Sequence, residues 1–368
     1  MKKRIVSLIL AAVLTLLTVS SCGQSKTPAI TFRETVVTEN EYCYWMSYYK
    51  GYFLQSYFGL TQDNAAIWGT EMADGVTVAD YLGALAQTSV MSMLVYLQLF
   101  DEYGLTLTAE ETATVDKAID SLKNSVGGKS ALNSALSAYY IDTDMLHEIK
   151  LDQLRIAKIQ EYLFGQNGIE TATGTELLEH FKETFYRVQY IYISNAKDFV
   201  RDENGEIVVK EDGSYATRDL TPTEKAEKKA LADDLALSIA AGEDFEALMK
   251  EYTMDMGMLH FSDGYYFNSS SAYLNYIDAA AVAGVPKMEI GAVESVETDA
   301  GWYIVKRLPL NEDAILDETN AVMFADLISQ VNAIKSQELV ASFAKEILPN
   351  PEVIENCRLE YSTPNFYY

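Results

Sequence analysis

Apolar residues between positions 36 and 165 fall into segments that begin at capping boxes and end at glycines. Thr38 with Glu41, and Thr108 with Glu111, have the Thr-x-x-Glu spacing in which each side chain bonds to the other residue's backbone N–H. Such signals mark helix starts, and the glycines mark helix ends. We expect an all-helical region with helices at about 38–58, 77–103, 108–126, 130–139 and 143–164.

The pattern of apolar positions changes after a third capping box, whose helix ends near residue 185. Residues 187–193 alternate and are rich in β-formers, which predicts a strand. Asn-Gly and Asp-Gly pairs at 204–205 and 212–213 are typical hairpin turns. Beyond them we expect helices at about 221–241 and 245–252, strands at 294–296 and 302–305, and one long helix at 318–346. This order of elements indicates an α+β fold.

The first residues have the composition of a secretory signal. Three basic residues precede an apolar run at 5–19, which is too short to cross a bilayer comfortably and is followed by a polar stretch. The small residues before Cys22 resemble a bacterial lipobox, in which the Cys receives a diacylglycerol and becomes the mature N-terminus. We expect a lipoprotein anchored to the outer face of the cell membrane. The alternative is an ordinary signal peptide with an incidental Cys.

The length of 368 residues favours two domains. We divide the chain into a lipoprotein signal peptide, a tether, a helical domain, an α+β domain, and a C-terminal helix with a tail. Their predicted bounds are 1–21, 22–35, 36–172, 173–310 and 311–368.

Composition narrows the range of partners. The net charge is −26, and removal of a leader with three basic residues and no acidic ones takes it to −29. Nucleic acid is an improbable partner, because binding it requires a basic surface. The three histidines have no metal-ligand spacing, so neither a metal nor another cofactor is expected. A disulfide between Cys43 and Cys357 is permitted outside the cytoplasm, but their spacing gives no evidence for one.

The second region resembles the parvulin (PpiC-type, rotamase) family of peptidyl-prolyl isomerases. The layout of the whole chain resembles that of the PrsA and SurA folding factors, so the resemblance implies a SurA-like helical domain followed by a parvulin-like one. It covers residues 175–310 and rests on the order and spacing of several short motifs. They are the strand 188–193, Ala-Gly-Glu-Asp-Phe at 241–245, Tyr-Thr-Met-Asp at 252–255, Asp-Gly-Tyr-Tyr-Phe at 263–267 and Gly-Trp-Tyr-Ile-Val-Lys-Arg at 301–307.

The resemblance implies a catalytic site at Asp255, Tyr190 and Tyr303. The family has histidines at the positions of Tyr190 and Tyr303, where they form a hydrogen-bonded pair beneath the substrate proline. Tyrosines can still donate and accept hydrogen bonds, but they do not titrate near neutral pH. His260 lies five residues after Asp255, and we interpret it as an incidental loop residue.

The resemblance also implies a proline pocket. Tyr273 and Ile277 have the four-residue spacing of the family's pocket residues, and Phe267 could form a wall. The alternative is that these residues pack the core of a small helix. The first predicted helix is rich in aromatic residues, with nine Tyr, Trp and Phe residues between 42 and 58. These rings could line a cradle for unfolded polypeptide, or they could be buried by neighbouring helices.

We therefore expect a lipid-anchored, extracytoplasmic folding factor that isomerises prolyl bonds in secreted proteins. Its partners would be unfolded or newly secreted polypeptides with Xaa–Pro bonds. The principal alternative is a non-catalytic holdase or scaffold with a degenerate parvulin domain. A transporter's ligand-binding lipoprotein is disfavoured, because the repeated strand–helix alternation of two α/β lobes is absent. A hydrolase is disfavoured because no Gly-x-Ser-x-Gly motif occurs.

Overall fold

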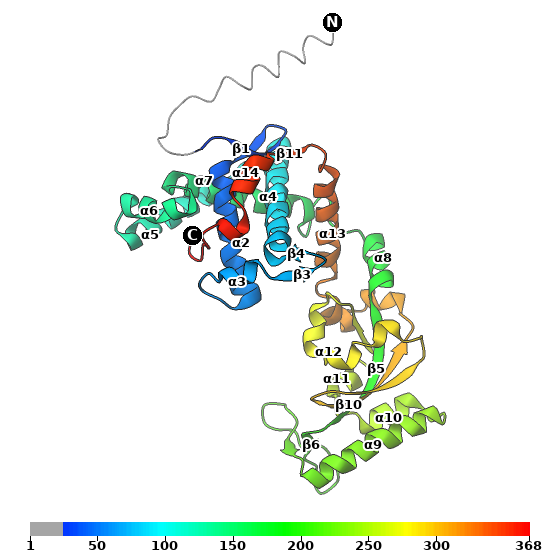
Figure 1. Cartoon of the computed structure of the whole chain (residues 1–368). Coiled ribbons are helices and arrows are strands. Elements are labelled where there is room, and N and C mark those ends of the chain that lie inside the picture. Colours follow the sequence, from blue (N-terminus) through cyan, green and yellow to red (C-terminus); the bar gives the residue numbers. More distant parts are fainter. Residues whose placement is uncertain (1–24) are drawn as a thin grey trace. The chain divides into compact units, whose positions relative to one another are not determined.

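The computed structural model describes residues 25–368 and divides them into two compact units (Figure 1). Unit 1 contains the residues up to 169 together with residues 336–368, and unit 2 contains residues 170–335. The predicted signal peptide and the lipidation residue Cys22 lie outside the described residues. The α+β class is confirmed, because unit 1 is largely helical and unit 2 combines helices with a four-stranded sheet.

The long helices of unit 1 begin where the sequence has capping boxes. The Thr38 backbone N–H donates to Glu41 Oε2 at 2.7 Å at the start of α2, and Gly59 ends this helix with a left-handed φ of 64°. The elements are α2 (Glu39–Phe58), α3 (Ala65–Trp68), β3 (Glu71–Ala73), β4 (Val76–Thr77), α4 (Val78–Glu102), α5 (Ala109–Val126), α6 (Lys129–Leu136), η1 (Ser137–Tyr139) and α7 (Thr143–Phe164). The five helices expected from the sequence are therefore present within a few residues.

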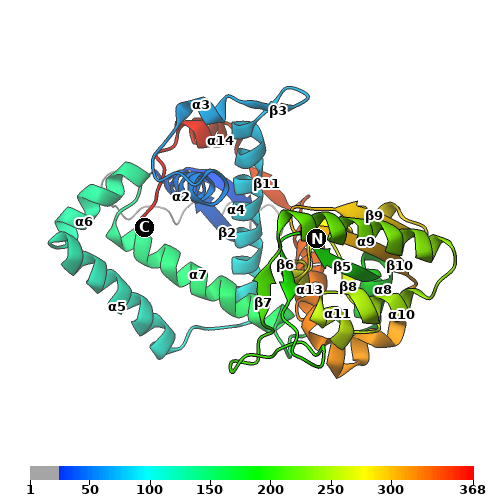
Figure 2. The ribbon, with the colours of Figure 1, turned by 90° about the horizontal axis from the view of Figure 1, so that it is seen from below.

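Helix α4 is the central helix of unit 1. It packs against α2 and α7, and Figure 2 shows α5 and α6 leading away from α4 and α7 returning to it. Among the described residues it alone is long and apolar enough to cross a membrane. Its residues Leu82, Val90 and Leu94 are buried in the core of unit 1.

The segment predicted as a tether instead belongs partly to a sheet. Strands β1 (Pro28–Phe32) and β2 (Thr35–Thr38) form a hairpin, and β11 (Ile347–Pro349) pairs antiparallel with the outer side of β1. The reason is apolar burial, since Ala29, Ile30 and Phe32 are inaccessible to solvent. In the described part of the tether, residues 25–27 and the turn at 33–34 lie outside the strands.

The C-terminal segment of unit 1 packs onto α2. It contains the end of α13 (Leu327–Ser342), β11, α14 (Pro351–Asn356) and η6 (Leu359–Tyr361). Lys50, only 1% exposed, donates to the carbonyl oxygens of Glu360 and Ser362 at 3.0 and 2.9 Å. A Cβ at Gly51 would overlap the backbone of Asn365, so glycine is required for this close approach.

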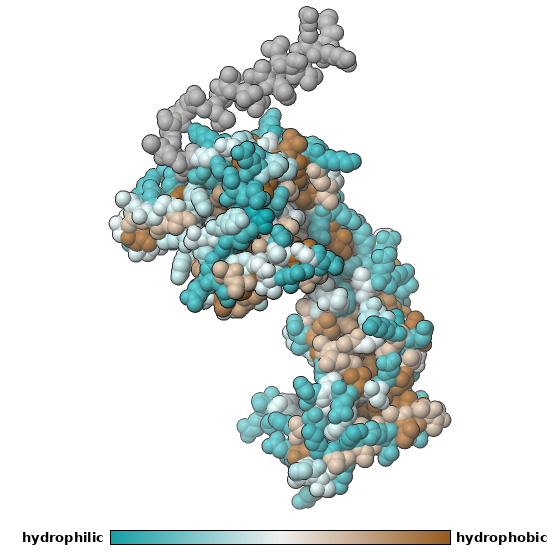
Figure 3. Space-filling model, viewed as in Figure 1, coloured by the Kyte–Doolittle hydropathy of each residue, from teal (hydrophilic) through white to brown (hydrophobic). Residues whose placement is uncertain are grey.

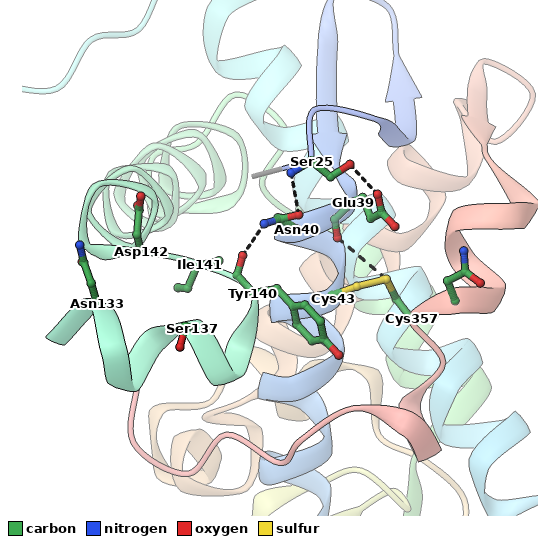
Figure 4. Close-up of a pocket in the computed structure, with 11 residues that line it drawn as sticks. Ser25, Glu39, Asn40, Cys43, Asn133, Ser137, Tyr140, Ile141, Asp142 and Cys357 are labelled. Atoms are coloured by element: carbon green, nitrogen blue, oxygen red, sulfur yellow. Dashed lines mark hydrogen bonds between the residues drawn. A yellow bond between two sulfur atoms is a disulfide. The ribbon is translucent and has the colours of Figure 1, made fainter. Parts of the chain in front are cut away.

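A disulfide between Cys43 and Cys357 joins α2 to the residue after α14. The question left open by the sequence is therefore answered by the packing of the tail. A hollow of about 500 Å³ with a mixed polar and apolar lining lies beside the disulfide (Figure 4). Asn40 lies at its side, where it accepts from the Ser25 N–H and donates to the Tyr140 carbonyl.

Unit 2 is built on a four-stranded antiparallel sheet in the order β8-β5-β10-β9. Its helices α9 and α10 pack against β5, and α9 also packs against β10 (Figure 2). A small ribbon, β6 with β7, extends the loop after β5. The elements are α8 (Gly174–Thr184), β5 (Tyr186–Ser194), β6 (Lys197–Phe199), β7 (Thr217–Asp219), α9 (Pro222–Ala240), α10 (Phe245–Tyr252), α11 (Met256–His260), β8 (Tyr265–Phe267), η2 (Ala272–Tyr276), α12 (Ala279–Val282), η3 (Val285–Lys287), β9 (Val293–Glu297), β10 (Gly301–Leu308), η4 (Glu312–Leu316) and η5 (Glu318–Phe324).

The single long helix expected at 318–346 is interrupted. Residues 318–324 form the 3₁₀ helix η5, and α13 begins only at Leu327. Met323 is fully buried and its sulfur accepts from the Tyr266 N–H, while Phe324 packs on Phe181 at 5.5 Å between ring centroids. These contacts hold the segment against unit 2, whereas the residues from 336 onward belong to unit 1.

Candidate active site

Asp255 is placed beside β5 by hydrogen bonds from the segment that precedes it. The Met254 N–H donates to the Tyr192 carbonyl at 2.8 Å, and the Tyr192 N–H donates to the Thr253 hydroxyl at 3.1 Å. Asp255 is also the N-cap of α11, where its Oδ1 accepts from the N–H groups of Gly257 and Met258 at 2.8 and 3.3 Å. One carboxylate oxygen thus caps the N-terminus of α11, and the other faces the sheet.

Two tyrosine hydroxyls donate to that second oxygen. Tyr190 Oη lies 2.5 Å and Tyr265 Oη 3.1 Å from Asp255 Oδ2. In the register of the sheet Tyr265 pairs with Val188, so Tyr265 and Tyr190 share one face. Their rings meet edge to face with centroids 5.6 Å apart. The carboxylate therefore receives four donors from its own chain.

Tyr303 completes the cluster on the same face of the sheet. It pairs with Tyr192 across β5 and β10, stacks on that ring at 4.7 Å, and meets the Tyr190 ring edge to face at 5.3 Å. The three residues predicted as catalytic, Asp255, Tyr190 and Tyr303, thus lie together. Asp255 bonds only to Tyr190 of the predicted tyrosine pair.

Burial governs the electrostatics of this cluster. It raises the pKa of Tyr190, and the neighbouring Asp255 charge raises it further. Burial likewise raises the pKa values of Tyr265 and Tyr303, and that of Tyr273 to about 12. The phenols therefore remain protonated at physiological pH and act as hydrogen-bond donors.

The predicted proline-pocket residues are buried in the substrate-free chain. Phe267, Tyr273 and Ile277 are 4%, 6% and 7% exposed. The Tyr273 ring meets the Tyr265 ring edge to face at 5.4 Å, which places it next to the Asp255 cluster. Phe267 packs on Tyr186 at 6.1 Å from the opposite end of β8. Their role in substrate binding stays a prediction.

At two further residues, His260 and Tyr265, the structure differs from what the sequence predicted. His260 is the last residue of α11 and so lies in a helix, not in a loop as expected; it is exposed and packs on Phe261. Tyr265 was not among the predicted site residues, although it bonds to Asp255. Its position two residues before Phe267, on the same face of a strand, was the signal that could have identified it.

Within residues 25–368, no group of three or more His, Cys, Asp and Glu side chains is arranged to hold a metal ion. The cluster offers donors and a carboxylate, which suits stabilisation of a polar transition state by hydrogen bonds.

Comparison with known proteins gives a family for the second region. A search of curated proteins found no match. Among solved structures, the chain is similar to PrsA from Bacillus subtilis (19% identity, covering 77% of this chain and 93% of that one, TM-score 0.24). It is also similar to the peptidylprolyl isomerase PrsA from Bacillus cereus (17%, 80% and 98%, TM-score 0.27) and to the foldase protein PrsA from Streptococcus pneumoniae (16%, 79% and 98%, TM-score 0.23).

Residues 203–308 match the family described as the PPIC-type PPIASE domain. The match includes Asp255, Tyr265 and Tyr303, and it begins after the strand that carries Tyr190. It agrees with the motifs and their order in the sequence, and so confirms the predicted resemblance. Residues 203–308 of this chain are therefore similar to the PPIC-type PPIASE domain of parvulin-type peptidyl-prolyl cis-trans isomerases.

Proposed function

We propose that this protein is a lipid-anchored extracytoplasmic folding factor that isomerises Xaa–Pro bonds in newly secreted, unfolded polypeptides. The basic and apolar leader and the lipobox-like sequence before Cys22 support the anchor. The Cys43–Cys357 disulfide supports an oxidising location, because such bonds are rare in the cytosol. The acidic chain does not repel basic or apolar client segments.

The reaction requires no proton transfer. An Xaa–Pro bond isomerises over tens to hundreds of seconds, because the planar amide resists rotation. In the twisted transition state the carbonyl and the nitrogen lose conjugation, so a well-placed hydrogen-bond donor stabilises it more than the planar ground state. Each tenfold acceleration needs about 1.4 kcal/mol of such preferential stabilisation.

The observation that carries the proposal is the convergence of Asp255, Tyr190 and Tyr303 on one face of the sheet. Asp255 accepts the Tyr190 proton and so fixes the direction of that hydroxyl. Tyr303 has no hydrogen bond to Asp255, and its hydroxyl lies beside the Asp278 carboxylate, which interacts with it and helps to raise its pKa. We assign this hydroxyl as the donor toward the twisted amide. The raised pKa values keep both phenols protonated through the physiological range.

The test is cis/trans exchange at an Xaa–Pro bond of a short peptide, measured by NMR with the chain from Ser25 onward. We expect acceleration that falls about tenfold in Tyr303→Phe and at least as far in Asp255→Asn. Tyr266→Phe is the matched control, because Tyr266 lies in the same strand as Tyr265, on the other face, and bonds to Asp263 at 2.7 Å. A folded wild type without any acceleration would overturn the proposal for that class of peptide.

A second candidate function is holding unfolded chains without catalysis, and one surface of unit 1 favours it. Residues 81–100 of α4 contain no charged side chain. The hydroxyls of Thr88 and Ser92 donate to carbonyls of their own helix at 2.9 Å. These hydroxyl donors therefore need no hydrogen bond from water. Between this face and residues 337–349 lies a mainly apolar hollow of about 330 Å³.

On the face shown in Figure 3, exposed hydrophobic residues (brown) are scattered among hydrophilic ones. The exposed rings of the aromatic helix α2 include Tyr52 and Tyr57, while Tyr42, Tyr44 and Trp45 of the same helix are buried. Four of the nine rings of the predicted aromatic cradle are therefore buried in the core, Tyr48 and Tyr49 are partly buried against it, and the three exposed rings lie in the C-terminal half of the helix. Suppressed aggregation of an unfolded protein, without accelerated prolyl exchange, would favour this second function.

A further inference from the structure

The carboxylate of Asp255 has no acceptor position left for a substrate. A carboxylate offers about four acceptor sites, and four donors of this chain occupy them: two backbone N–H groups at Oδ1 and the hydroxyls of Tyr190 and Tyr265 at Oδ2. Asp255 therefore acts on the reaction through the groups it holds. The role of Tyr265 follows from this arrangement.

We propose that Tyr265 is a positioning residue of the isomerase site, which fixes the Asp255 carboxylate so that the Tyr190 hydroxyl keeps one orientation. The proposal rests on the proposed isomerase function and extends it to a residue outside the predicted set. With two hydroxyl donors on Oδ2, rotation of the carboxylate breaks both bonds at once. The Tyr190 hydroxyl then keeps donating its hydrogen bond to Asp255. Its oxygen lone pairs face the rest of the cluster.

A glycine makes room for the Tyr265 hydroxyl. Gly257 lies in α11, and a Cβ there would overlap Tyr265 Oη, while it would lie 3.6 Å from Cζ, which is ordinary van der Waals contact. The φ of Gly257 is not positive, so its backbone conformation does not require glycine. Alanine is the better helix former at such a site. The bond between Tyr265 and Asp255 thus explains the residue at 257.

Moving the Tyr265 ring aside would disrupt the packing around it. It is 3% exposed and is enclosed by the rings of Tyr190, Tyr273 and Phe261, with centroids 5.6, 5.4 and 6.0 Å away. Displacing a buried ring from such a cage breaks close packing. The hydroxyl is therefore held at Asp255 by the cage as well as by its hydrogen bond.

The first test is Tyr265→Phe, measured as prolyl exchange over a range of peptide concentrations. We expect kcat to fall about tenfold while KM stays unchanged, because Tyr265 supports Asp255 and does not contact the substrate. Tyr266→Phe removes a buried, Asp-bonded hydroxyl from the same strand and should leave both parameters unchanged. An unchanged kcat in a folded Tyr265→Phe variant would overturn the proposal.

The second test uses Gly257 and needs no loss of a hydroxyl. Gly257→Ala should lower kcat about as much as Tyr265→Phe, because the new methyl group displaces Oη from Asp255. Added to Tyr265→Phe, it should cost little more, since the methyl then faces a ring carbon at 3.6 Å and only Asp255 Oδ1, at 3.0 Å, must shift slightly. Full additivity of the two substitutions would contradict the proposal.

A spectroscopic measurement separates this proposal from the isomerase function itself. The Tyr190 hydroxyl proton is buried and shared with Asp255 at 2.5 Å, so its NMR resonance reports on that bond. Loss of the competing donor in Tyr265→Phe should move it downfield, whereas Tyr266→Phe should not. If the wild type lacks isomerase activity but the resonance moves, the isomerase function fails and the coupling of Tyr265 to Tyr190 stands. A resonance that does not move overturns the coupling.

Discussion

Lys50 in unit 1, which is buried, and Asp255 in unit 2, which is partly buried, are charged side chains with several hydrogen-bond partners each, and these partners differ in kind. In unit 1, Lys50 bonds to two backbone carbonyls and to Asp63 at 2.8 Å, and its ammonium lies 5.1 Å from the centre of the Trp68 ring. In unit 2, Asp255 bonds to two backbone N–H groups and to two tyrosine hydroxyls.

The difference separates a structural charge from a functional one. Backbone carbonyls are fixed acceptors in the fold, so the Lys50 bonds end there and hold the C-terminal segment against α2. A phenol that donates its proton keeps lone pairs for another hydrogen bond, so the Asp255 network continues to the face where Tyr303 lies. The range of the contacts differs too: residues 310 and 312 positions away contact Lys50, whereas Tyr190 is 65 positions from Asp255.

The largest effect is expected from Lys50→Met. It keeps most of the apolar stem but leaves two buried carbonyls and Asp63 without their cation, so unit 1 should lose about 3 kcal/mol of unfolding free energy. Hydrogen exchange followed by mass spectrometry can report the stability of each unit from its own peptides. Prolyl exchange, which depends on unit 2, should not change.

A matched control exists in the same unit. Lys123 pairs with Asp120 at 3.1 Å on the surface of α5, so Lys123→Met should change stability by less than about 0.5 kcal/mol. Equal effects of the two substitutions, or a loss of isomerase activity in Lys50→Met, would show that the separation of structural and functional charge is wrong.

Sequence alone predicted the elements that local signals specify. The capping boxes at Thr38, Thr108, Thr173 and Thr221 each begin a helix, because cap and partner are three residues apart. Nothing local announced that Ile347 and its neighbours pair with β1, since that contact joins residues more than 300 positions apart. The early strand was therefore expected as a tether.

The candidate site shows the same limit at shorter range. Family motifs indicated Asp255, Tyr190 and Tyr303, and the structure brings these residues together. Tyr265 lay within a quoted motif, but its hydrogen bond depends on strand register and on the absence of a side chain at Gly257. The space that Gly257 leaves for the Tyr265 hydroxyl can be recognised only in the three-dimensional structure.

The disulfide offers a second test of the comparison, with an expected effect of similar size. It joins residues 314 positions apart and closes a loop that includes all of unit 2. Replacing Cys43 and Cys357 by alanine should destabilise unit 1 by about 3 kcal/mol, because the unfolded chain gains freedom. Unit 2 should exchange its amides as before, since its folded segment is continuous.

The control for this test is the wild type under reducing conditions, which should match the double variant. Comparable destabilisation of unit 2 would mean that the two units unfold together. The unfolding free energies of the two units could then not be compared separately.

The smallest expected effect is a dependence of the stability of unit 1 on pH. Burial raises the pKa of Asp152 in α7 to about 6, although Arg155 bonds to it. The usual value in an unfolded chain is about 3.9, so the folded state favours the protonated form. Its stabilising contribution is complete below pH 4 and is lost as the pH rises through 6. Unit 1 should therefore gain about 1 kcal/mol between pH 7 and pH 5.

Unit 2 should respond in the opposite direction and at lower pH. Glu176 and Glu224 cap α8 and α9, and their bonds to Lys335 and Arg218 lower both pKa values to about 2. Their contribution is present above about pH 4.5 and is lost only as the pH falls toward 2. Asp152→Asn should abolish the gain of unit 1 between pH 7 and 5 in hydrogen-exchange experiments and leave unit 2 unchanged. A gain that persists in this variant would have to come from another group of unit 1.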